Sequence, residues 1–73
     1  MTVVKEDELN CAMNIAKQYA EQYKDWRWGQ CVFNAFYAYF PEITDSIRGT
    51  NDDCFYDDNK VEKFLLHFQI KEK

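Results

Sequence analysis

Three cysteines and one histidine are the side chains of this chain best suited to ligate a metal or to act as nucleophiles. They are Cys11, Cys31, Cys54 and His67, which together have the composition of a Cys₃His zinc site. Structural zinc sites contain ligand pairs a few residues apart, whereas these cysteines are 20 and 23 residues apart along the chain. The local sequence activates none of the thiols as a nucleophile. The spacing therefore favours reduced, mostly buried thiols over a zinc site, a disulfide scaffold or a Cys–His pair.

A cluster of aspartates in the second half of the chain is the other group that could bind a cation: Asp52, Asp53, Asp57 and Asp58. If an EF-hand loop began at Asn51, its positions 5 and 6 would be Phe55 and Tyr56, where calcium needs an oxygen ligand and a glycine. We therefore expect these carboxylates to serve turns and helix caps, with no metal and no cofactor. The sequence also contains no Gly-rich phosphate loop and no HExxH motif, so we expect no enzymatic activity.

The charge of the chain narrows the partners that it can bind. Its 73 residues include 13 acidic and 9 basic side chains, for a net charge of -4. Seven of the acids lie between Glu42 and Glu62, a segment that has only two bases. Nucleic-acid binding depends on lysines and arginines that neutralise phosphates, so it is not expected here. A basic protein surface is the better electrostatic match for the acidic segment.

Membrane insertion and secretion are also not expected. No run approaches the roughly 18 consecutive apolar residues that a membrane span needs. The first ten residues, MTVVKEDELN, carry acids where a signal peptide needs a basic region followed by an apolar one. The expected location is the cytoplasm, which is the host cytoplasm if a phage encodes the chain.

The elements that must position these residues are helices. Apolar side chains recur at steps of three and four over residues 5–23 and 26–39, and again after residue 57. Pro41 suits the first turn of a short helix over residues 41–47, and Gly49 suits the left-handed position after it. We expect one all-α domain over residues 1–73, a compact bundle of three to four helices with an ordered acidic loop before the last one.

Single residues predict how the helices begin and meet. Asp25 is a suitable N-cap for the second helix, and Asp57 or Asp58 for the last. With Asp57 as the cap, Tyr56 and Val61 take the two positions of a hydrophobic staple. Gly29 costs about 1 kcal/mol against alanine inside a helix, so we expect another backbone, that of a neighbouring helix, to approach it closely.

The loop over residues 50–56 has aromatic side chains, so we expect at least one of Phe55 and Tyr56 to enter the core. Arg27 and Arg48 are the only arginines, and we expect one or both to form bidentate bonds with Asp52, Asp53 or Asp57. This clamp, which includes Gly49, would hold the loop against the second helix; the alternative is an arginine that contacts an anion or a partner. The amides of Gln30 and Asn34 are expected to bond the same segment, or alternatively to contact a ligand.

Residues 26–58 also carry a recognisable pattern. It consists of Arg27-x-Gly29-Gln30, Phe33-Asn34, Pro41, Arg48-Gly49-Thr50 and Asp53-x-Phe55-Tyr56. The pattern resembles that of small phage and bacterial proteins with no established activity, and Cys54 stands where those proteins often have proline. The resemblance implies a phage or prophage context, and it assigns no catalytic residue.

The aromatic side chains give the strongest indication of function. Two Trp, five Tyr and six Phe are more rings than four short helices readily enclose, so some must reach the surface, where they favour interfaces. The candidate partner-binding residues are Trp26, Trp28, Tyr39, Asp52, Asp53 and Asp57. We expect a non-enzymatic interaction protein, such as a phage accessory factor that binds a host or phage protein. The alternatives are a self-associating homodimer and a weak nucleic-acid binder that uses Lys24, Arg27 and Trp28.

Overall fold

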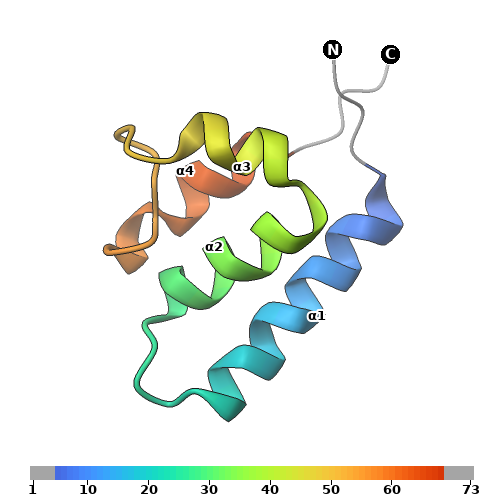
Figure 1. The fold of residues 1–73 in the computed structure, drawn as a ribbon, viewed down its shortest axis with the longest axis vertical. Coiled ribbons are helices and arrows are strands. Elements are labelled where there is room, and N and C mark those ends of the chain that lie inside the picture. The colour runs from blue at the N-terminus through green and yellow to red at the C-terminus, as the bar shows by residue number, and fades with distance from the viewer. Residues whose placement is uncertain (1–4, 69–73) are drawn as a thin grey trace.

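The computed structural model describes residues 5–68, and within them the chain is helical with no strand. Four α-helices and one 3₁₀ turn follow one another: α1 (Glu6–Gln22), α2 (Trp28–Tyr39), α3 (Pro41–Ile47), η1 (Asp58–Lys60) and α4 (Val61–Leu66). Figure 1 shows α1 and α2 as an antiparallel pair, with α3 and α4 at one side of α2. The predicted small all-α bundle is confirmed.

The pairing of α1 with α2 depends on small side chains. Ala12 and Ala16 of α1 and Ala35 of α2 are fully buried, and small residues at a contact allow two helix axes to approach closely. The first turn of α1 carries Glu6, Asp7 and Glu8, as the helix dipole favours. The helix predicted over residues 5–23 is therefore confirmed, and each of its observed ends differs from the predicted one by one residue.

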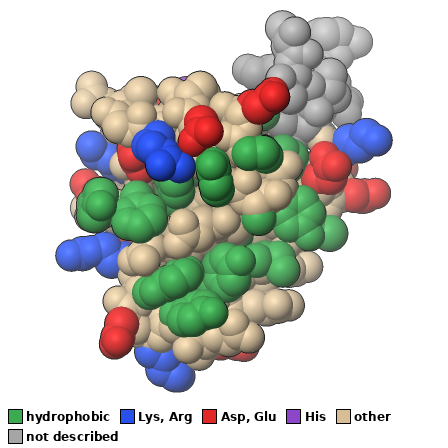
Figure 2. Space-filling view, in the orientation of Figure 1, with side chains coloured by type: hydrophobic (Ala, Val, Ile, Leu, Met, Phe, Trp, Pro, Cys, Tyr) green, Lys and Arg blue, Asp and Glu red, His purple; other side chains and the backbone are tan. Residues whose placement is uncertain are grey.

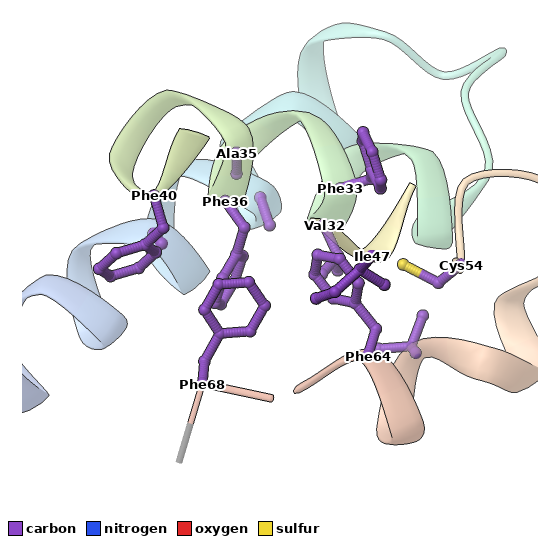
Figure 3. Packing of buried hydrophobic residues seen from close by; sticks show 12 residues of the cluster. Val32, Phe33, Ala35, Phe36, Phe40, Ile47, Cys54, Phe64 and Phe68 are labelled. Carbon is purple, nitrogen blue, oxygen red and sulfur yellow. The ribbon is translucent and has the colours of Figure 1, made fainter. Parts of the chain in front are cut away.

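The centre of the fold is a cluster of phenylalanines from α2, from α4 and from Phe68, which follows the end of α4. Phe36 of α2 is fully buried, and its ring centroid lies 4.8 Å from that of Phe68 and 5.8 Å from that of Phe64. Figure 3 shows these rings against one another, with Val32 and Ile47 beside Phe64. Val61 and Leu65 complete the contribution of the last helix. The predicted core stripe of the last helix is therefore confirmed.

The short helix α3 follows its sequence signals closely. It begins at Pro41 and ends at Ile47, as predicted. Gly49 has a φ of 79°, the left-handed conformation that ends a helix at little cost only when the residue is glycine. The Thr50 hydroxyl donates a hydrogen bond to the Ile47 carbonyl at 2.6 Å, which turns the chain into the following loop.

Two predicted helix starts need correction. Asp25 and Trp26 lie in a turn, and α2 begins at Trp28 with Arg27 as its N-cap residue. Asp57 does act as a cap, accepting a bond from the Asn59 backbone N–H at 2.9 Å, but it caps a 3₁₀ turn that only then leads into α4. Tyr56 is 79% exposed and forms no staple with Val61.

The sequence predicts that the charged C-terminal residues 71–73 fray, and these residues lie outside the described part of the chain. Over residues 5–68, no helix combines the length and the apolar character that a membrane crossing requires.

Candidate protein-interaction site

The acidic loop, residues 48–57, lies against the start of α2 through a backbone contact at Gly29. A Cβ atom at this position would lie 2.0 Å from the carbonyl oxygen of Cys54, closer than two such atoms can approach. The Cys54 thiol in turn donates to the Gly29 carbonyl, with an Sγ–O distance of 3.4 Å. The close approach predicted for Gly29 is confirmed, although the approaching backbone belongs to the loop and not to a helix.

Asp58 provides the N-terminal cap that α2 lacks locally. Its Oδ1 accepts a hydrogen bond from the Gly29 backbone N–H at 2.8 Å, across 29 residues of sequence. The side chain of Arg27, the residue at the N-cap position, makes no such bond. A carboxylate at this end also has favourable electrostatics, because the first turn of a helix carries partial positive charge. Sequence reasoning assigned Asp58 only to the last helix, since no local signal marks a cap that arrives from elsewhere in the chain.

Asp53 holds the acidic loop in one conformation. Its Oδ2 accepts from the Gly49 backbone N–H at 2.7 Å, and its Oδ1 accepts from the Phe55 N–H at 2.9 Å. The Asp52 backbone N–H donates a hydrogen bond to the Thr50 hydroxyl oxygen at 3.3 Å. Phe55 packs against the core and meets Phe33 edge-on at 5.5 Å between ring centroids. The prediction of an ordered loop is confirmed, and Phe55 is the ring that packs against the core, although it stays partly exposed.

The arginines do not form the predicted clamp. Arg48 pairs with Asp45 at 3.1 Å, where both side chains are more than half exposed. Its guanidinium carbon lies 5.6 Å from the ring centroid of Phe33 and 5.3 Å from that of Tyr37. Within residues 5–68, no salt bridge joins either Arg48 or the exposed Arg27 to a loop carboxylate. The Arg48 guanidinium instead lies between its exposed partner Asp45 and the rings of Phe33 and Tyr37.

Among the described residues, His67 makes the one hydrogen bond between side chains that joins the end of α4 to the acidic loop. Its Nε2 lies 2.8 Å from Oδ2 of Asp52, and both side chains are partly exposed. Lys63 and Leu66 complete an open hollow around the pair. The pair ties the middle of the acidic loop to the end of the last helix.

The cysteines are buried structural thiols at two of the three positions. Cys31 and Cys54 are fully buried, whereas Cys11 is exposed, and all three are free. Burial raises the pKa of Cys54 to about 12, with a smaller contribution from the negative charge of Asp53. Burial also raises the pKa of Cys31, and the charge of Asp58 adds to it. Such thiols are poor nucleophiles, and no group of three metal-ligating side chains occurs in the described part of the chain.

A surface hollow of about 300 Å³ opens between α2 and the acidic loop. We call it the loop hollow, and its lining consists of Phe33, Asn34, Tyr37, Arg48, Asp53, Phe55 and Tyr56. Tyr37 is 40% exposed and Tyr56 is 79% exposed. The Asn34 side chain is half-buried and has no hydrogen bond to any residue between 5 and 68, so it does not make the predicted bond to the loop. The loop hollow thus combines accessible rings with an amide that is free to bond a ligand.

The three aromatic residues predicted to contact a partner lie elsewhere. Trp26 is half-buried and stacks on Tyr23, with ring centroids 4.3 Å apart and an interplanar angle of 15°. Trp28 is half-buried and packs against the core. Tyr39 is 41% exposed but does not line the loop hollow. Sequence reasoning missed Tyr37 as an accessible ring, because its place on a mostly apolar helix resembled a core position.

The predicted acidic partner residues all belong to the acidic loop but have different surroundings. Asp53 lines the loop hollow, whereas Asp52 lies in the hollow beside His67 and Asp57 caps η1. These bonds fix the carboxylates in place and leave their charges at the surface. Figure 2 shows how hydrophobic groups reach one face of the molecule in separate patches, with charged side chains between and around them.

Comparisons of the chain with protein-family models, with curated proteins and with solved structures found no match.

Proposed function

We propose that this chain is a non-enzymatic interaction protein that binds a protein partner through the loop hollow and the acidic groups beside it. The observation that carries the proposal is the 79% exposure of Tyr56 on a loop whose backbone is fixed on both sides by hydrogen bonds. Exposed tyrosines are frequent interface anchors, and one held on a rigid support loses little entropy on binding. The resemblance of residues 26–58 to phage proteins suggests a phage or host protein as the partner.

Charge indicates what kind of protein surface the partner has. The net charge is -4, and the acidic loop and its flanks contribute Asp45, Asp52, Asp53, Asp57 and Asp58. Opposite charge speeds association and disfavours wrong partners. The same net charge opposes self-association, because two copies would together carry -8. We therefore propose a basic partner in preference to a homodimer or a nucleic acid.

A pull-down from host lysate with three immobilised baits tests the proposal. The baits are the natural chain, a Tyr37→Ala/Tyr56→Ala double variant, and a Tyr23→Ala control in which the exposed ring lies on the C-terminal side of α1, outside the loop hollow. We expect the natural chain and the control to recover the same protein at low salt, with less at high salt, and the double variant to lose it. Equal recovery by all three baits, or recovery of nothing specific, would overturn the proposal. A dimer in light scattering at tens of micromolar would show self-association instead.

A further inference from the structure

We infer that the loop hollow binds a short proline-rich segment in the polyproline II conformation, flanked by arginine or lysine. This inference rests on the proposed function and names the chemistry of the partner. It depends on three properties of the hollow, which are its rings, its free hydrogen-bonding groups and its charge.

The rings come from two elements; the Arg48 guanidinium lies over the rings of Phe33 and Tyr37, while part of Tyr37 and most of Tyr56 stay exposed. Phe33 is 4% exposed and forms an apolar base, against which Phe55 packs edge-on. Tyr37 on α2 and Tyr56 on the loop are the accessible rings at this base. Tyr56 also packs on Phe55, at 4.7 Å between centroids. Aromatic-lined surfaces of this kind suit the compact, rigid ring of proline.

The polar groups match what a polyproline II segment offers. Such a segment has no internal hydrogen bonds, so its carbonyl groups need outside donors. The Asn34 amide and the hydroxyls of Tyr37 and Tyr56 make no hydrogen bond within residues 5–68, and all three residues line the loop hollow. They can therefore donate to the carbonyls of a bound segment without breaking an existing bond.

The other common modes of peptide recognition fit less well. Strand addition needs an exposed sheet edge, and residues 5–68 contain no strand. A helix needs a groove with several apolar anchors in line, whereas Asn34, Arg48 and Asp53 interrupt this lining. An acidic or phosphorylated peptide needs a cluster of free arginines. Arg48 is the one arginine here; it already pairs with Asp45 and shares the hollow with Asp53.

The charges around the loop hollow select basic flanks. Asp53 lies within it, and Asp45 neutralises part of the charge of Arg48. Asp52 and Asp57 belong to the same loop but lie outside this lining, with their side chains held by hydrogen bonds. A proline-rich segment with arginine or lysine at its ends therefore meets carboxylates that are already in position, which lowers the entropic cost of pairing.

The test uses three labelled peptides against the full chain. The probe is Arg-Arg-Pro-Pro-Leu-Pro-Pro-Arg-Arg; one control replaces every proline with alanine, and the other replaces every arginine with glutamate. Fluorescence anisotropy gives the affinities, and amide shifts in NMR spectra locate the bound peptide. We expect the probe to bind at least fivefold more tightly than either control, with shifts at Asn34, Tyr37 and Tyr56. Equal binding of the alanine control, or shifts confined to other surfaces, would overturn the inference.

Matched variants separate this inference from the proposed function. Tyr56→Ala and Asn34→Ala should each weaken the probe at least fivefold, and Tyr23→Ala should leave its affinity unchanged; thermal melts verify that each variant folds. If the double variant loses the protein partner while the probe does not bind, the proline-rich class is wrong and the interaction surface stands. If neither protein nor peptide depends on the loop hollow, both proposals fail.

Discussion

The phenylalanine core and the contact at Gly29 hold the same bundle together by different physical means. In the core, Phe36, Phe64 and Phe68 are fully buried, and their packing energy is spread over many weak contacts. At the second region, which we call the Gly29 seam, Gly29, Cys54 and Asp58 meet through single atoms at fixed distances. A core of this kind tolerates rearrangement among apolar residues, whereas the seam depends on the identity of each residue.

The largest expected effect is that of Gly29→Ala. Alanine normally stabilises a helix interior by about 1 kcal/mol over glycine. Here the added Cβ would lie 2.0 Å from the Cys54 carbonyl oxygen, and a backbone cannot rotate away as a side chain can. We expect a loss of about 3 kcal/mol in the free energy of unfolding, measured by urea denaturation.

Gly49→Ala is the matched control for that substitution. Nothing lies within 4 Å of an added Cβ at Gly49, so its only cost is the positive φ of 79°, about 1 kcal/mol. If Gly29→Ala proved as stable as the natural chain, the close approach at the seam would be wrong, and the two regions would not differ as described.

A smaller effect is expected for Asp58→Ala. The substitution removes the acceptor for the Gly29 N–H and so leaves the first turn of α2 without its cap. We expect a loss of about 1–2 kcal/mol in denaturant titrations, and partial recovery with Asp58→Asn, which keeps an oxygen acceptor. Asp45→Ala, which removes only an exposed pair with Arg48, should change stability by less than about 0.5 kcal/mol. Equal effects at Asp58 and Asp45 would contradict the remote cap.

The smallest effect concerns the alkaline pH dependence of stability. The Cys54 thiol has a pKa of about 12 in the folded chain, against an ordinary value of 9.0. Above pH 9 the unfolded chain loses this proton and the folded chain keeps it. The contribution of Cys54 to the free energy of unfolding is therefore complete below pH 9. This contribution falls as the pH rises toward 12, by about 1 kcal/mol at pH 9.5.

Cysteine variants isolate this pH effect from the titration of other groups. Under reducing conditions, Cys54→Ala should flatten the fall in melting temperature between pH 8 and 9.5. Cys11→Ala, which removes an exposed thiol, should leave the slope unchanged. Identical slopes for the natural chain and Cys54→Ala would show that burial of this thiol does not govern the pH dependence.

The sequence was sufficient wherever the determining signal is local. Periodic apolar residues predicted α1 and the core side of α4, and Pro41 with Gly49 predicted α3 and its end. Gly29 was also informative, since a glycine inside a helix suggested a close backbone contact. Each of these inferences used residues within a few positions of the element that they describe.

The sequence was insufficient where the partner is distant along the chain. The start of α2 was placed too early because Asp25 is a good local cap, while the actual acceptor is Asp58. The arginine clamp was wrong because Arg48 lies over the rings of Phe33 and Tyr37, which only the fold brings beside it, and pairs with Asp45. The loop hollow was not predicted for the same reason, since its lining comes from residues that only the fold brings together.

The Gly29 seam also constrains how this chain can change over generations. A larger residue at position 29 requires the chain near Cys54 to move outward. This movement breaks the hydrogen bond from the Cys54 thiol to the Gly29 carbonyl and takes Asp58 out of reach of α2. Viable descendants should therefore keep the glycine or alter all three positions together. Covariation at these positions would mark proteins that share this architecture even after the rest of their sequences have diverged.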